Sequence, residues 1–165
     1  MSIQFLEPSR LTNWPAVQEF VPTRHSDTYP FISTAGGDLG GKSVLVAGAS
    51  RGIGRQIALS FVRAGCSRIA VAARSSLAEL EQDIAAAAAE AGRPRPRVLA
   101  VRADLTTEDG VASLASQIDT KFGGELDVLI NNAGRCESLL PIPESNVDDY
   151  WSTWEVNSTW PLVNI

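Results

Sequence analysis

The chain has 165 residues, which is enough for about one domain with a core of its own. Its hydrophobic content of 44%, charged content of 20% and net charge of −5 are typical of a globular protein and argue against general nucleic-acid binding. No apolar run approaches the roughly 18 residues of a membrane span, and the N-terminus has no signal or transit pattern. We therefore expect a cytoplasmic protein with no membrane or nucleic-acid partner. Its cysteines, Cys66 and Cys136, are expected to stay reduced and to bind no metal.

Residues 1–41 carry four of the nine prolines and four of the thirteen glycines, with no sustained periodicity. We expect an irregular arm here, followed by a domain over residues 42–165. The arm's aromatic residues are expected to dock onto that domain; they are Trp14, Phe20, Tyr29 and Phe31. Residues 42–105 carry ten Arg and Lys against five Asp and Glu, a local balance that would favour an anionic ligand.

From Lys42 onward, short apolar runs alternate with helical patterns. The runs predict strands over residues 44–47, 68–73, 97–105 and 126–134. Such an alternation indicates an α/β fold in which a parallel sheet is covered by helices on both faces through right-handed crossovers.

Four helices are predicted between and after these strands. Their signals are Ile53, Ile57 and Phe61 up to Gly65; a capping box at Ser76 and Glu79 with Leu77, Leu80 and Ile84 up to Gly92; Val111, Leu114, Ile118 and Phe122; and Ser145 and Asp148 before Trp151 and Trp154.

Two neighbouring patterns could each hold a phosphate. Residues 36–43 fit the triphosphate loop G-x-x-x-x-G-K-[ST], and residues 48–54 carry glycines at positions 48, 52 and 54. A triphosphate loop must follow a strand and open a helix, but Lys42 and Ser43 lead into a β-branched run. Residues 48–54 follow a strand and precede a helical pattern, so we favour them as the phosphate-binding loop.

The glycine spacing and three later motifs resemble the short-chain dehydrogenase/reductase family. The later motifs are Asp104-Leu105 after the third strand, Asn131-Asn132-Ala133-Gly134 after the fourth, and Asn157. The resemblance implies a Rossmann-type doubly wound sheet and a nicotinamide cofactor. The cofactor-binding residues it implies are Gly48, Ser50, Arg51, Gly52, Ile53, Gly54, Arg74, Ser75, Asp104, Leu105, Asn131, Ala133 and Gly134, with Asn157 as the one catalytic position.

The residues after the second strand favour NADP(H) over NAD(H). NAD-binding sites usually place an acid about 20 residues past the loop, where this chain has Ala73. Arg74 and Arg51 would pair with a 2′-phosphate, with no acid expected to compete for them.

The catalytic Tyr-x-x-x-Lys of the family is absent from residues 1–165. We therefore expect the cofactor-binding half of a reductase, from a truncated product or a longer reading frame, that is inactive alone. The complete form would act on a carbonyl or alcohol. The family's sheet order leaves strands 3-2-1-4 here, with the fourth strand and nearby tryptophans, including Trp160, as an exposed edge. A homo-oligomer is expected only with the missing half.

Two alternatives remain open at this point. One is a noncatalytic NADP-binding or interaction module that keeps the loop without chemistry. The other is a methyltransferase that uses S-adenosylmethionine, since such enzymes have a similar first glycine loop.

Overall fold

The computed structural model describes residues 25, 27–138 and 140–159. The chain divides into two units, residues 1–33 and 34–165. In the first unit, the described residues include a 3-10 turn, η1 (Pro30–Ile32), and a stacked pair formed by His25 and Tyr29. Trp14, Phe20 and Trp160 lie outside the described residues. The second unit contains the sheet and its helices.

Four parallel strands form one sheet in the order β3-β2-β1-β4. The strands are β1 (Ser43–Ala47), β2 (Arg68–Ala73), β3 (Arg97–Arg102) and β4 (Val128–Asn131). The predicted strand order is therefore confirmed, with β4 bonded to β1. The chain moves outward from β1 to β3 and then crosses back to β4, so the direction of winding reverses between β1 and β4.

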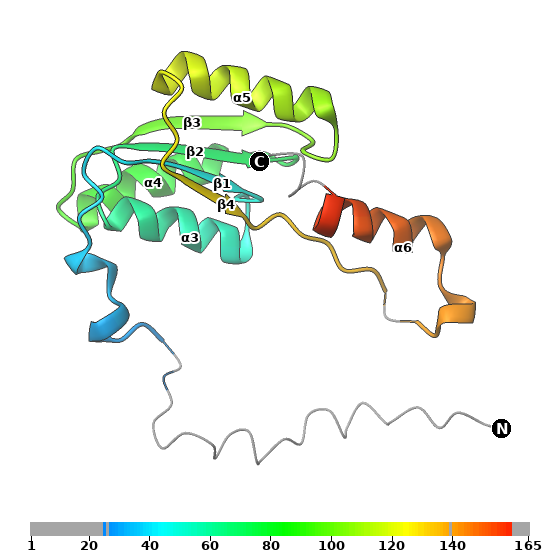
Figure 1. The fold of residues 1–165 in the computed structure, drawn as a ribbon. Helices are drawn as coiled ribbons and strands as arrows, with labels where there is room; N and C mark the ends of the chain where they lie inside the picture. Colours follow the sequence, from blue (N-terminus) through cyan, green and yellow to red (C-terminus); the bar gives the residue numbers. More distant parts are fainter. Residues whose placement is uncertain (1–24, 26, 139, 160–165) are drawn as a thin grey trace. The chain divides into compact units, whose positions relative to one another are not determined.

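Helices cover both faces of this sheet, as Figure 1 shows, so the predicted doubly wound α/β class is confirmed. The helices are α3 (Gly52–Arg63), α4 (Ala78–Glu90), α5 (Glu108–Phe122) and α6 (Val147–Trp154), and the π-helical turn η4 (Glu155–Thr159) follows α6. Two further 3-10 turns are η2 (Thr34–Gly36) and η3 (Ile142–Glu144). In Figure 1, α3 and α4 lie on one face of the sheet and α5 on the other.

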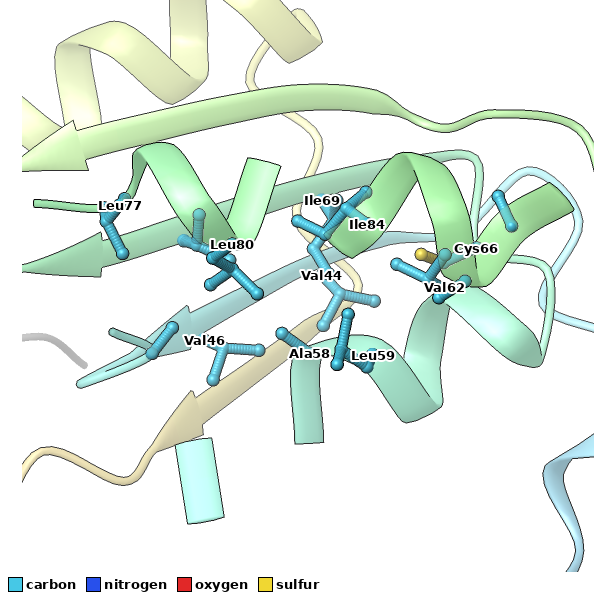
Figure 2. Packing of buried hydrophobic residues seen from close by; sticks show 14 of the residues in the cluster. Val44, Val46, Ala58, Leu59, Val62, Cys66, Ile69, Leu77, Leu80 and Ile84 are labelled. Carbon is cyan, nitrogen blue, oxygen red and sulfur yellow. The ribbon is translucent and has the colours of Figure 1, made fainter. Parts of the chain in front are cut away.

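The strands bury both of their faces, which gives the sheet two hydrophobic cores. In β1, alternate side chains point to opposite faces: Val44 and Val46 join the core under α3 and α4, whereas Leu45 and Ala47 join the core under α5. Figure 2 shows the first core, where Ile84 of α4 reaches the sheet. Since every residue of β1 is buried, a continuous apolar run was its sequence signal.

Two predicted helix starts are wrong. Helix α4 begins at Ala78, and Ser76 Oγ accepts a hydrogen bond from Ala78 N at 3.4 Å. Among the described contacts, Ser76 and Glu79 make no hydrogen bond with each other, so the predicted capping box does not form. Helix α6 is capped by Asn146, whose side chain accepts a hydrogen bond from Asp149 N, instead of by Ser145. In both places the local pattern was correct in type, but the N-cap lies one residue later than predicted.

The stripe of Ile53, Ile57 and Phe61 lies on the flank of α3. Ile53 is 75% exposed, and the other two are only partly buried against the first core. The face that packs on the sheet consists of Gly54, Ala58, Leu59 and Val62. Gly54 and Ala58 in this face are small, which lets the helix approach the strands closely there.

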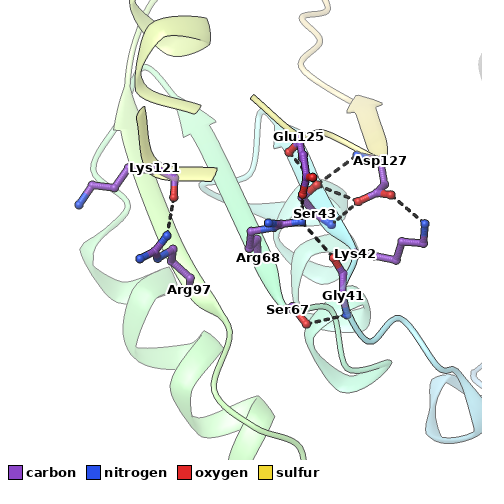
Figure 3. Close-up of polar contacts among 9 residues, drawn as sticks. All are labelled: Gly41, Lys42, Ser43, Ser67, Arg68, Arg97, Lys121, Glu125 and Asp127. Carbon is purple, nitrogen blue, oxygen red and sulfur yellow. Dashed lines mark hydrogen bonds and ion pairs between the residues drawn. The ribbon is translucent and has the colours of Figure 1, made fainter. Parts of the chain in front are cut away.

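The amino-terminal ends of the strands are tied together by polar contacts (Figure 3). Asp127 accepts hydrogen bonds from Ser43 N at 2.7 Å and from Lys42 Nζ at 2.8 Å. These two donors and the Ser43 hydroxyl hold the pKa of the Asp127 carboxyl well below its usual range, the contact with Lys42 contributing most. Arg68 donates to Glu125 at 2.7 Å beside them. Lys42, the lysine of the triphosphate-like pattern, is therefore paired with Asp127 at the amino-terminal end of the sheet, whereas the glycines of residues 48–54 lie at its carboxyl end.

Strand β4 forms one edge of the sheet. Its apolar residues Val128, Leu129 and Ile130 are half-buried, while β1 beside it is buried throughout. Leu126, just before the strand, is 39% exposed. Among the described residues, this edge is thus exposed, as predicted.

Candidate functional site

A cavity of about 670 Å³ lies at the carboxyl ends of the strands, where β1 and β4 separate. Its position is the point of winding reversal at which doubly wound sheets bind ligands. Its lining comes from the segments that follow all four strands and from η4. The lining residues are Gly48, Ser50, Arg51, Gly52, Ile53, Gly54, Ala73, Arg74, Ser75, Ala103, Asp104, Leu105, Thr106, Asn132, Ala133, Gly134 and Val156.

Three glycines let the loop between β1 and α3 take its shape. Gly48 has a φ of +71°, and a Cβ on it would come within 2.6 Å of Ala133 Cα. A Cβ on Gly54 would meet Gly48 O at 2.3 Å. Gly52 has a φ of +57° and faces open space, since a Cβ on it would have no described atom of another segment within 4 Å. The first two glycines are therefore required by packing, whereas Gly52 leaves its backbone open toward the cavity.

The N-terminus of α3 adjoins this open backbone. Its N-cap residue, Arg51, makes no side-chain capping bond, so the N-cap side chain accepts no hydrogen bond from the first N–H groups of the helix. These groups and the helix dipole favour a negatively charged ligand. A dinucleotide pyrophosphate has the charge and the acceptor oxygens for this place, so the loop fits the cofactor that the sequence motifs imply.

Asn132 joins the glycine loop to the end of β4. Its side-chain Nδ2 lies 3.2 Å from Ala47 O and 3.1 Å from Gly48 O and donates to both. The amide thereby satisfies carbonyl groups that the parting strands leave unpaired. The geometry of the loop thus depends on a residue 84 positions away from Gly48.

Arg51 and Arg74 both line the cavity. Both are exposed, and their guanidinium groups make no hydrogen bond or ion pair with any residue that the structure describes. Ala73, which precedes Arg74, also lines the cavity and offers no acidic side chain. The arginines are thus available to an anionic group.

Asp104 is an acid near Arg74, which corrects the expectation that no acid competes for that arginine. Its carboxylate accepts hydrogen bonds from Thr106 N at 3.0 Å and Thr106 Oγ1 at 2.8 Å. These two bonds, and then the charge of Arg74, lower the pKa of Asp104. The two residues are 30 positions apart in the sequence, and adjacent parallel strands bring them together.

The segment after β4 is fastened to α6 and η4 by Arg135. Its backbone N–H donates to Asn157 Oδ1 at 2.8 Å, and Asn157 Nδ2 donates to its carbonyl at 2.8 Å. Its guanidinium pairs with Asp149 and donates to Ser152 Oγ. These contacts place Val156 of η4, which is buried, in the cavity wall.

The structure brings twelve of the thirteen predicted cofactor-binding residues into the cavity lining. Asn131 is the last residue of β4 and does not line the cavity. Asn157, the predicted catalytic position, contacts Arg135 next to the lining residue Val156. The predicted set of cofactor-binding residues did not include the lining residues Ala73, Ala103, Thr106, Asn132 and Val156. Two of them had a signal in the sequence: Asn132 belongs to the Asn-Asn-Ala-Gly motif, and Ala73 stands where NAD-binding sites place an acid.

Comparison with known proteins agrees with this geometry. The family model described as short chain dehydrogenase matches residues 42–163. The chain belongs to the short-chain dehydrogenase family. Family membership removes the basis for the methyltransferase alternative, which depended on the glycine loop alone.

Relatives of the family in fungi and bacteria are similar over most of this chain. The short chain dehydrogenase mpl6 of Monascus purpureus is 44% identical over 138 residues, which are 84% of this chain and 47% of the relative. A solved short-chain type dehydrogenase/reductase from Mycobacterium marinum has a TM-score of 0.67 at 30% identity, over 77% of this chain and 47% of that one. A metagenomic short-chain oxidoreductase, solved in complex with NADP, has a TM-score of 0.66 at 30% identity, over 76% of this chain and 54% of that one. The chain thus spans about half the length of these relatives.

Membrane spans and clusters of metal ligands are both missing from the described part of the chain. Its helices are all too short or too polar to cross a bilayer. Within the same residues, no three or more His, Cys, Asp or Glu side chains gather as metal ligands would.

Proposed function

We propose that this chain binds NADP(H) and belongs to an oxidoreductase that transfers hydride between the nicotinamide and a carbonyl or alcohol substrate. The observation that carries the proposal is the cavity at the winding reversal, where the open backbone of Gly52 and the N-terminus of α3 meet two arginines that pair with no described residue. Family membership supports the class of reaction. One similar solved structure is a complex with NADP, which supports the choice of cofactor.

The preference for the phosphorylated cofactor depends on charge. Arg51 and Arg74 offer guanidinium donors that match a phosphate, whereas Ala73 offers no acceptor for a ribose hydroxyl. Asp104 reduces the net positive charge, but the two hydrogen bonds from Thr106 hold its carboxylate back toward its own turn. The balance favours a 2′-phosphate over a free hydroxyl.

When bound, the nicotinamide would supply the hydride donor or acceptor, and the residues of this chain would hold and enclose it. Gly52 and the first turn of α3 would bind the pyrophosphate, and Asp104 with Leu105 would adjoin the adenine end, as the family resemblance implies. Asn157 uses both ends of its amide on the Arg135 backbone. We therefore assign its side chain a positioning role and no proton transfer.

A second candidate function is cofactor binding without turnover. Its basis is local to the cavity, where no described lining side chain is a tyrosine or a lysine that could serve as a proton donor and its partner. Under either candidate, we expect residues 1–165 alone to bind the cofactor and to oxidise or reduce no substrate. Sequencing the native transcript past the Ile165 codon separates the two, since only the first requires that segment to follow in frame.

A paired titration tests the cofactor assignment. NADPH and NADH are titrated calorimetrically into the 165-residue chain and into Arg74→Ala. NADPH should bind more tightly than NADH, and the variant should lose about tenfold in NADPH affinity, the low end for a hydrogen bond to a charged group because Arg74 is exposed. NADH affinity should not change. Equal losses for the two cofactors would refute the NADP assignment.

A further inference from the structure

Arg102 is the last residue of β3, and its side chain reaches the segment that follows the neighbouring strand. The parallel register pairs Ala73 with Arg102, and the last backbone bond between the strands runs from Ala103 N to Ala73 O at 3.0 Å. Arg102 Nε donates to the carbonyl of Arg74, the residue that follows Ala73, at 2.8 Å. A side chain therefore adds one more bond after the backbone ladder of β2 and β3 has ended.

This bond fixes the orientation of the peptide between Arg74 and Ser75. A trans peptide is planar, so its carbonyl and its N–H point in opposite directions. With the Arg74 carbonyl held by Arg102, the N–H of Ser75 is directed away from Arg102. Among the described residues, no backbone–backbone hydrogen bond involves residues 74–76. This turn is exposed at all three residues, and the bond from Arg102 ties it to β3.

Both residues joined by that peptide line the cavity, whereas Arg102 itself does not. Arg102 is therefore placed to act on a ligand through the turn that it holds. Its charge also adds to those of Arg51 and Arg74 and offsets the neighbouring Asp104, whose pKa is lowered by its bonds with Thr106 and by Arg74.

We propose that Arg102 is a positioning residue for recognition of a ribose 2′-phosphate, because it holds the Arg74–Ser75 peptide in the orientation that presents both residues to that phosphate. The inference rests on the proposed NADP(H) function. It adds a residue outside the cavity whose removal selectively weakens binding of the phosphorylated ligand.

The test uses two small ligands and a matched control. Adenosine 2′,5′-bisphosphate and adenosine 5′-monophosphate, which differ only in the 2′-phosphate, are titrated into the 165-residue chain, into Arg102→Met and into Arg97→Met. Arg97 begins the same strand and also donates to a backbone carbonyl, that of Lys121 at 2.7 Å, but at the opposite end of the sheet (Figure 3). Arg102→Met should weaken binding of the bisphosphate about threefold to tenfold, the range expected for one hydrogen bond, and should leave the affinity for adenosine 5′-monophosphate unchanged. Arg97→Met should alter neither affinity.

Repeating the titrations at high salt concentration distinguishes a positional effect of Arg102 from an effect of its charge. At about 1 M salt the screening length is about 3 Å, so a purely electrostatic contribution of Arg102 disappears while a positional one persists. A selective loss that remains at this salt concentration supports the inference, and a loss that vanishes overturns it.

The remaining outcomes are also decisive. If the unaltered chain binds the two ligands equally, the NADP(H) proposal fails. If the unaltered chain prefers the bisphosphate and Arg102→Met keeps the full preference, the inference about Arg102 fails and the cofactor assignment stands. Equal weakening of both ligands, or the same effect from Arg97→Met, also overturns the inference, because it indicates a general change of the fold or of net charge.

Discussion

Replacing Gly52 by alanine should separate binding from stability. Gly52 has a φ of +57°, and its added methyl group would meet no atom of the described protein within 4 Å. The structural cost is therefore the left-handed backbone alone, about 1–2 kcal/mol for a residue with a Cβ. For a unit of this size that corresponds to a loss of roughly 4–8 °C in Tm. The methyl group would, however, stand on the open side of the loop, where we propose that the pyrophosphate binds.

The expected loss of affinity follows from the contacts that the methyl group would prevent. Holding the backbone away from a charged oxygen forfeits at least one hydrogen bond to a charged group, worth about 1.5–3 kcal/mol, or roughly 10- to 100-fold in the Kd for NADPH. Thermal denaturation gives the stability, and calorimetric titration gives the affinity.

Gly92 provides the matched control. It follows α4, has a φ of +64°, faces open space and does not line the cavity. Gly92→Ala should therefore lower Tm as much as Gly52→Ala and leave NADPH binding unchanged. If both variants bind NADPH equally well, the loop does not approach the cofactor as we propose.

Three further predictions concern the rest of the structure. Lys42 and Ser43 lower the folded-state pKa of Asp127, so the stability that the Asp127 carboxylate contributes should be present above about pH 4, its unfolded pKa, and be lost as the pH falls further. Asp127→Asn should flatten this loss of stability at acid pH in urea unfolding, and an unchanged pH profile would contradict the prediction. Arg135→Asp should increase proteolysis within α6, and adding Asp149→Arg should restore protection; a double variant as sensitive as the single one would argue against the ion pair. Cys136 is exposed, whereas burial raises the pKa of Cys66 to about 11, so a thiol reagent should label only Cys136 rapidly in the folded chain, and equal rates would exclude this burial.

Element types and strand order were predictable because they depend on local periodicity and on a recognisable motif order. The fully buried β1 reads as a continuous apolar run, and the glycines at 48, 52 and 54 mark a turn between strand and helix. Helix starts were less predictable. Ser76 and Ser145 have the right chemistry for a cap, but the tertiary path of each turn placed the first helical residue elsewhere.

Contacts between distant segments could not be predicted from the sequence. Nothing local to Arg74 indicates that Asp104 is its neighbour or that Arg102 holds its carbonyl, because the parallel register of β2 and β3 creates both proximities. In the same way, the apolar stripe that begins at Ile53 predicted α3 correctly but not which side of it packs. That side was decided by the close approach of helix and sheet.

The sequence by itself determined the kind of fold and the residues of the glycine loop, because turn geometry and the alternation of strands and helices follow from residue type and spacing. Only the tertiary structure decided the shape and charge of the cavity, since these depend on where strands of different sequence position end beside one another. The clearest example is Asn132, whose amide closes the loop at Gly48. It does so because β1 and β4 are adjacent in the sheet, although 84 residues separate the two positions along the chain.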